Sequence, residues 1–144
     1  MLSIIISSYN QIFFNKIKNN INSTIGNGFI YEIVKIENNN VFSLCEAYNI
    51  GGQKAKYDNL LFLHEDVSFE TSNWGTILIN LLELKNCGII GVLGGNYYGF
   101  MPSYWWNKGY KFFHYIQINK GKEKFYNRIN FLKDNEEVKA LDGV

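Results

Sequence analysis

The sequence predicts one α/β domain with a mostly parallel central sheet flanked by helices. Short apolar runs typical of strands alternate with segments whose apolar residues recur at helical spacing. This β-α-β-α-β-α-β order favours parallel strands joined by right-handed crossovers. With 144 residues, 47% of them hydrophobic, the chain is long enough to bury a single core.

The first strand is expected at residues 2–7, a β-branched run buried on both faces. Ser8 and Gln11 have the spacing of a capping box, which predicts that a helix starts there. The Gly-Asn-Gly sequence at 26–28 should end this helix. Its buried face would comprise Phe13, Phe14, Ile17, Ile21 and Ile25.

The following elements continue the alternation. A second strand at 31–36 brings Glu37 and three asparagines to the sheet edge, and a helix at 43–56 is weakened by two glycines in its middle. The third strand, at 59–63, holds four consecutive apolar residues and is also expected to be buried on both faces. A helix at 73–84 and a fourth buried strand at 88–93 complete the series.

The character of the chain changes after residue 94. A loop rich in glycine and aromatic residues precedes two alternating runs, at 112–118 and 124–131, that predict antiparallel strands. Residues 138–144 have the pattern of a further strand that is cut off at its start. We therefore expect the chain to be truncated at its C-terminus.

Composition excludes several classes of protein. A net charge of +1 argues against a dedicated nucleic-acid binder, and Arg128 is the single arginine. Cys45 and Cys87 form no disulfide framework or metal motif. No stretch approaches the roughly 20 apolar residues that span a bilayer, and no signal peptide is recognisable, so we expect no transmembrane segment and a cytoplasmic protein.

The end of the third strand is the first place to expect chemistry. His64, Glu65 and Asp66 follow it directly, and ligands of open α/β sheets lie beyond the carboxyl ends of their strands. Such groups could hold a divalent cation together with the phosphates that it neutralises. Alone, Asp66 could equally cap a turn and His64 could be structural. Strand alternation directs Glu65 to the opposite face, which favours a structural role.

The residues around this strand resemble family 2 glycosyltransferases, which have the GT-A fold. The family pattern is an Ala-x-Asn-x-Gly helix, a later alanine, and an apolar strand ending in Asp-x-Asp. Ala47, Asn49, Gly51, Ala55 and Asp66 stand at matching positions. His64 replaces the first aspartate, and with the following Asn-Trp-Gly at 73–75 this variant resembles one bacterial branch of the superfamily.

The resemblance covers about residues 2–100 and implies a domain organisation. The whole chain, 1–144, would be one GT-A (nucleotide-diphospho-sugar transferase-like) domain. Its nucleotide-binding part would span about 1–100, and an incomplete acceptor-side part about 101–144. In the family, a Leu-Asp-Gly like that at 141–143 is followed by much more chain.

The resemblance also implies a function. The domain would bind a nucleotide-sugar, UDP-linked, with Mn²⁺ or Mg²⁺ at Asp66 and His64. Ser8, Tyr9, Glu37 and His64 would contact the nucleotide, with the Glu37 carboxylate accepting the imide N–H of a uracil-type base. The sugar would pass with inversion to a hydroxyl of a glycan or other acceptor, and we assign no catalytic base.

Three aromatic residues are the acceptor-side candidates, because sugar C–H faces stack on aromatic rings. They are Tyr104, Trp105 and Trp106. Loop aromatics are more often core or the surface of a homo-oligomer, so that alternative stays open.

Other functions also stay open. The domain could be catalytically incomplete or degenerate, binding nucleotide without turnover, as the histidine at position 64 and the missing base favour. Less favoured are a nucleotidyltransferase, since the turn after the first strand is not Gly-rich and basic, and a carbohydrate-binding module that uses the tryptophan loop.

Overall fold

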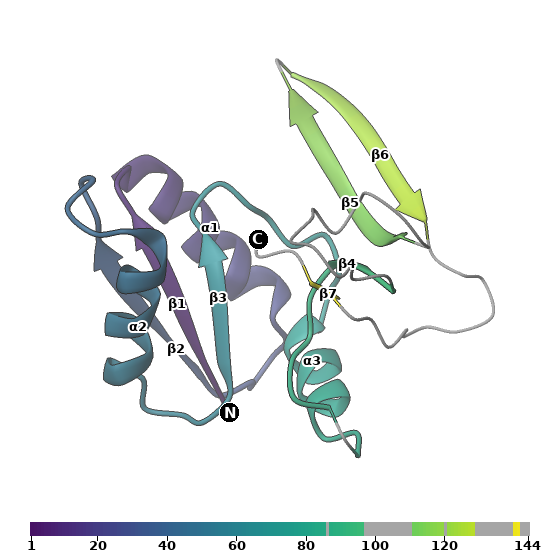
Figure 1. The fold of residues 1–144 in the computed structure, drawn as a ribbon, viewed down its shortest axis with the longest axis horizontal. Coiled ribbons are helices and arrows are strands. Elements are labelled where there is room, and N and C mark those ends of the chain that lie inside the picture. The colour runs from purple at the N-terminus through teal and green to yellow at the C-terminus, as the bar shows by residue number, and fades with distance from the viewer. Residues whose placement is uncertain (86, 97–110, 120, 129–139, 142–144) are drawn as a thin grey trace, which may run out of the picture. The chain divides into compact units, whose positions relative to one another are not determined.

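The computed structural model describes residues 1–85, 87–96, 111–119, 121–128 and 140–141 of the chain. The chain forms two compact units, Met1–Cys87 and Gly88–Val144, which are described here separately. Unit 1 contains the predicted α/β layers, and unit 2 contains an antiparallel sheet (Figure 1).

A parallel three-stranded sheet forms the centre of unit 1. Its strands are β1 (Leu2–Ser8), β2 (Tyr31–Glu37) and β3 (Leu60–His64), in the order β2-β1-β3. The register places Ile5 of β1 opposite Val34 on one side and Phe62 on the other. As predicted, β1 is buried on both faces, because it is the central strand and helices cover both sides.

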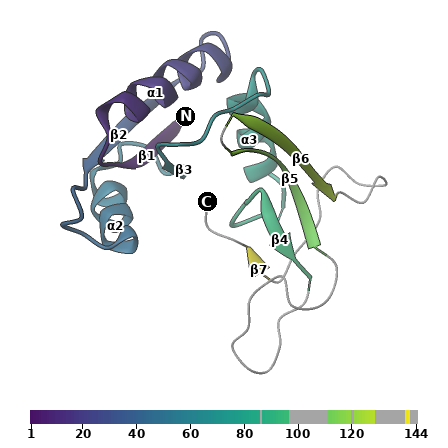
Figure 2. The same ribbon diagram turned by 90° about the horizontal axis from the view of Figure 1, so that it is seen from above.

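Two helices cover opposite faces of this sheet (Figure 2). Helix α1 (Gln11–Thr24) buries Phe14, Ile17 and Ile21 against the even-numbered side chains of β1, and Ile25 follows it in the same core. Helix α2 (Leu44–Lys54), capped by Ser43, packs Ala47 on Ile5 of the other face. The predicted apolar face of the first helix is confirmed, although Phe13 is only half-buried.

The start of α1 differs from the prediction. Ser8 is the last residue of β1 and caps nothing, so the expected capping box is wrong. Asn10 is the N-cap, and its side-chain oxygen accepts hydrogen bonds from the backbone N–H groups of Ile12 (2.9 Å) and Phe13 (3.4 Å). The strand continues to Ser8 because its residues pair with β2 as far as Glu37.

The prediction that the third strand is buried on both faces is wrong. Leu60 and Phe62 keep 38% and 39% of their surface exposed, whereas Leu63 on the opposite face is buried. The physical reason is position, because β3 lies at the edge of its sheet and α2 packs on β1 and β2.

The last helix of unit 1 is α3 (Trp74–Leu82), which buries Trp74 in the core beside α1. The predicted fourth parallel strand at 88–93 is wrong. Residues 88–92 are not in a strand, and Ile89 is 80% exposed. Glycines at 88 and 91 lower the strand propensity of this run, and it pairs with no strand among the described residues.

Unit 2 is an antiparallel sheet in the order β6-β5-β4-β7. Its strands are β4 (Leu93–Gly95), β5 (Lys111–Asn119), β6 (Lys122–Arg128) and β7 (Ala140–Leu141). The predicted antiparallel pair after residue 110 is confirmed as β5 and β6, which turn at Gly121 with a positive φ of 74°. Of the strand expected at 138–144, the described part is β7, paired with β4.

The α/β class is thus confirmed, with a parallel sheet flanked by helices that is consistent with a GT-A-like fold. None of the helices in the described ranges is long and apolar enough to cross a membrane.

Candidate functional site

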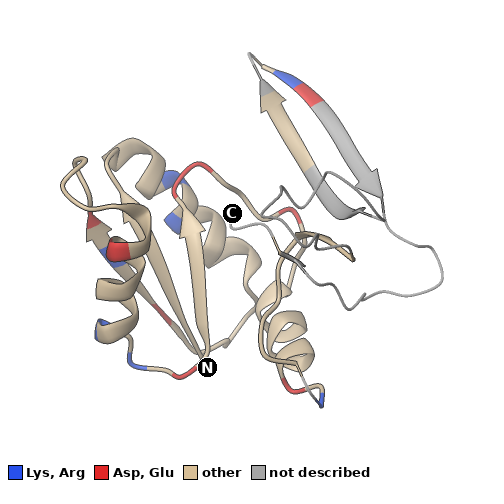
Figure 3. Ribbon diagram, in the orientation of Figure 1, with Lys and Arg blue, Asp and Glu red and all other residues tan. Residues whose placement is uncertain are grey.

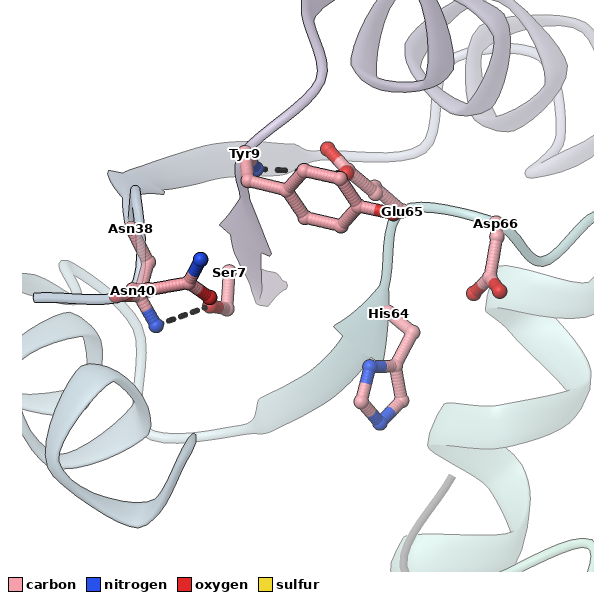
Figure 4. A pocket seen from close by; sticks show the side chains of 7 residues that line it. All are labelled: Ser7, Tyr9, Asn38, Asn40, His64, Glu65 and Asp66. Atoms are coloured by element: carbon pink, nitrogen blue, oxygen red, sulfur yellow. Dashed lines mark hydrogen bonds between the residues drawn. The ribbon is translucent and has the colours of Figure 1, made fainter. Parts of the chain in front are cut away.

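A hollow of about 160 Å³ opens at the carboxyl ends of the three parallel strands. The chain leaves β1 for β2 on one side and later returns for β3 on the other, so β1 and β3 flank a topological switch point. Ligands of open α/β sheets bind at such points. The lining residues come from all three strand ends and are Ser7, Tyr9, Asn38, Asn40, His64, Glu65 and Asp66 (Figure 4).

The pairing of β1 with β3 brings two lining residues side by side. Ser7 of β1 lies directly beside His64 of β3, on the sheet face that α2 covers. The Asn38 amide donates to Ser7 Oγ at 3.2 Å and to the carbonyl of Phe42 at 3.0 Å, and its oxygen accepts from the Phe42 N–H. Asn38 therefore fixes the loop after β2 against the end of β1.

His64, the last residue of β3, and the two residues after it point to alternate sides, as strand alternation predicts. His64 and Asp66 point to one side, and Glu65 points to the other (Figure 4). Asp66 is exposed, and among the described residues no hydrogen bond or ion pair reaches its carboxylate. The imidazole and a free carboxylate thus face the same space.

Glu65 has a structural partner at the start of α1. The side chain is only 4% exposed, and its carboxylate accepts the backbone N–H of Asn10 at 3.1 and 3.2 Å and that of Tyr9 at 3.4 Å. The first N–H groups of a helix attract an anion. Here Glu65 accepts the N–H groups of the N-cap residue and of the residue before it, and the Asn10 side chain accepts those of Ile12 and Phe13, so these donors are already bonded within the protein.

The charge of the hollow is negative. Two carboxylates, Glu65 and Asp66, line it, and among the residues that the structure describes no lysine or arginine does. In Figure 3 the acidic segment that follows β3 is coloured red. A phosphate group entering it would therefore meet repulsion unless a cation came with it.

His64 and Asp66 could each donate one ligand to a metal. In the described part of the chain, no group of three or more His, Cys, Asp or Glu side chains could hold a metal ion. The donor set suits a hard or borderline cation whose other ligands are oxygens of a bound molecule.

The other predicted nucleotide contacts are placed differently. Tyr9 is 68% exposed and lines the hollow. Ser8 is buried and outside the lining. Glu37 stands at the same sheet edge but also outside the lining. Its carboxylate accepts from Lys35 Nζ at 2.8 Å, and this hydrogen bond and the lysine charge lower the pKa of Glu37.

Three residues of the lining were not predicted, namely Ser7, Asn38 and Asn40. The run of asparagines after the second strand was a usable signal, because asparagine favours turns at strand ends and tolerates positive φ. Asn40 has such a conformation, with a φ of 60°. Tyr104, Trp105 and Trp106, the predicted acceptor side, lie outside the described residues.

Comparison with known proteins adds one finding. The model of a glycosyltransferase-like family matches residues 3–144, nearly the whole chain. Searches of curated proteins and of solved structures gave no match.

Proposed function

Because this chain belongs to a glycosyltransferase-like family, we propose that the hollow in unit 1 binds the diphosphate of a nucleotide-sugar, with a divalent metal shared between protein and ligand. The donor would be UDP-linked, and the sugar would pass to a hydroxyl of a glycan or other acceptor. One observation carries the proposal, namely that the described lining at the switch point of a parallel sheet is negatively charged and includes no lysine or arginine.

The charge of the lining favours the metal. Backbone N–H groups at the start of α1 are already bonded to Glu65 and to the side chain of Asn10. Among the described residues, no lysine or arginine side chain lines the hollow. A diphosphate could then be held there by a cation bound to Asp66 and His64. Mn²⁺ accepts an imidazole ligand more readily than Mg²⁺, so we favour Mn²⁺. When bound, the metal would stabilise the negative charge that develops on the departing nucleoside diphosphate.

The residues of the chain would orient the nucleotide around that cation. Tyr9 is exposed at the hollow and could stack on the base. The bond to Lys35 uses one carboxylate oxygen of Glu37, so the other could accept the uracil N–H if the side chain turned toward the hollow. The side chain of Asn40 already lines the hollow. Ser8 has less support as a nucleotide contact, since its side chain is buried and its carbonyl accepts the N–H of Asn38.

Transfer with inversion needs a general base that takes the proton of the acceptor hydroxyl. Asp66 is the free carboxylate of the lining, and it is assigned to the metal. We therefore assign the base to no residue.

Calorimetric titration of UDP into the chain tests the proposal. We expect binding in the presence of Mn²⁺, loss of binding after chelation, and loss in Asp66→Ala. Asp58→Ala is the matched control, because Asp58 is also an exposed aspartate beside β3 but lies before the strand rather than after it.

The outcomes separate the alternatives. No binding by folded wild-type protein, or equal binding by Asp66→Ala, would contradict the proposed site. Metal-dependent UDP binding without sugar release from any UDP-sugar would favour a degenerate domain that retains the site.

A further inference from the structure

Tyr48 of α2 lies beside the proposed site without lining it. Its ring packs on Phe62, with centroids 5.1 Å apart, and meets the ring of His64 edge-on at 6.4 Å. Phe62 and His64 share the sheet face that α2 covers. The phenol therefore follows that face toward the edge where the hollow opens.

The hydroxyl of Tyr48 is buried and has no hydrogen-bond partner among the described residues. A buried donor without an acceptor costs roughly 1–3 kcal/mol of folding free energy. Phenylalanine would fill the same space without that cost, so packing alone does not explain a tyrosine at this position.

The negative charge of Asp66 acts on this hydroxyl. Burial, and next the negative charge of Asp66, raise the pKa of Tyr48 above its usual range. A tyrosine phenol is protonated at neutral pH in any case, so the hydroxyl can act as a hydrogen-bond donor. A donor close to the proposed cation position is suited to an anionic oxygen.

We propose that the Tyr48 hydroxyl donates a hydrogen bond to a diphosphate oxygen of the ligand bound beside His64 and Asp66. This inference rests on the function proposed above and adds a contact residue to the same site. Tyr48 is not part of the lining, so the bond requires a local adjustment of the side chains that cover it. Once formed, it would be shielded from competing water, which strengthens it.

Loss of the Tyr48 hydroxyl should affect ligand affinity but not the stability of the fold. Because no described residue is a hydrogen-bond partner of this hydroxyl, Tyr48→Phe should unfold at the same temperature as wild type or higher. Because the hydroxyl is used in the complex, the same change should weaken UDP binding in the presence of Mn²⁺ by about ten-fold or more, as for a hydrogen bond to a charged group. A purely structural role predicts no loss of affinity.

The experiment compares the melting temperature and the UDP affinity of wild type, Tyr48→Phe and Tyr57→Phe. Tyr57 is the matched control, a half-buried tyrosine at the opposite end of β3 whose substitution should leave binding unchanged. A stable Tyr48→Phe with weakened binding supports the proposal. Wild-type affinity in Tyr48→Phe overturns it, whereas absence of UDP binding by wild type overturns the proposed function itself.

Discussion

Glu65 accepts two contacts from the backbone N–H of Asn10, at 3.1 and 3.2 Å, and so connects the end of β3 to the first turn of α1. The two residues are 55 positions apart in the sequence. The contact links the segments that follow β1 and β3, which both line the hollow. It also gives the buried carboxylate of Glu65 a hydrogen-bond partner.

Removing this carboxylate should therefore lower stability. We expect Glu65→Ala to reduce the free energy of unfolding by about 1.5–3 kcal/mol, the range for hydrogen bonds to charged groups. Glu65→Gln keeps an acceptor oxygen and should lose less. Urea denaturation followed by circular dichroism measures both, and an unchanged midpoint for Glu65→Ala would refute the role given to this contact.

Two adjacent glycines in α2 should respond in opposite directions. A Cβ on Gly51 would lie 2.2 Å from Cγ2 of Ile5, a stiff side chain in the centre of the sheet, whereas a Cβ on Gly52 would lie 3.7 Å from Leu60. Overpacking costs about 1–3 kcal/mol, and alanine gains up to about 1 kcal/mol over glycine inside a helix. We therefore expect Gly51→Ala to lower the melting temperature and Gly52→Ala to raise it. The reverse order would show that α2 does not approach β1 as closely as described.

Acid should weaken unit 1 through Glu32. The hydroxyl of Ser3 donates to its carboxylate at 2.6 Å, and this bond, together with one from the backbone N–H of Lys56, lowers the pKa of Glu32 below 4.5. The unfolded state then binds the proton more tightly, so the stabilisation is complete at neutral pH and is lost as the pH falls below 4.5 toward the lowered value.

The measurement is the urea midpoint at neutral and acid pH. The glutamine in Glu32→Gln cannot titrate, so the urea midpoint of this variant should fall less from neutral to acid pH than that of wild type. Substitution of an exposed glutamate, Glu70→Gln, should leave the fall as in wild type. Parallel pH profiles for Glu32→Gln and wild type would contradict the assignment.

Tyr9 offers a direct test of base stacking. Its side chain is exposed, so Tyr9→Ala should leave the fold intact. If the ring stacks on the base, the substitution should weaken UDP binding about ten-fold, since base–aromatic stacking contributes roughly 1–3 kcal/mol. Tyr9→Phe keeps the ring and should bind nearly as wild type. Equal affinities for all three proteins would remove Tyr9 from the nucleotide site.

Sequence patterns correctly predicted the helices and strands whose type and buried face depend on residues close together in the chain. The buried face of α1 follows from apolar spacing, and the strand at β1 follows from a β-branched run that two helices cover. The direction of Glu65, away from His64 and Asp66, follows from alternation along an extended chain.

Other features depend on distant partners, and local patterns could not decide them. The run ending in Leu63 looks fully buried in the sequence, yet its strand is an edge strand. The run at 88–92 has a strand-like composition but no pairing partner. Ser7 and Asn38 enter the hollow because of strand register and a loop hydrogen bond, neither of which leaves a local pattern.

By itself, the sequence determined the α/β class, the order of the first elements, and the edge at which His64 and Asp66 would lie, because periodicity and strand order are properties of the chain. The tertiary structure decided which strand is central and that Glu65 rather than Asp66 is hydrogen-bonded. It also decided which hydroxyls are buried with no partner among the described residues, namely those of Ser8 and Tyr48. These depend on contacts between residues far apart in sequence, as between Glu65 and Asn10, and form only when the strands pair and the helices pack.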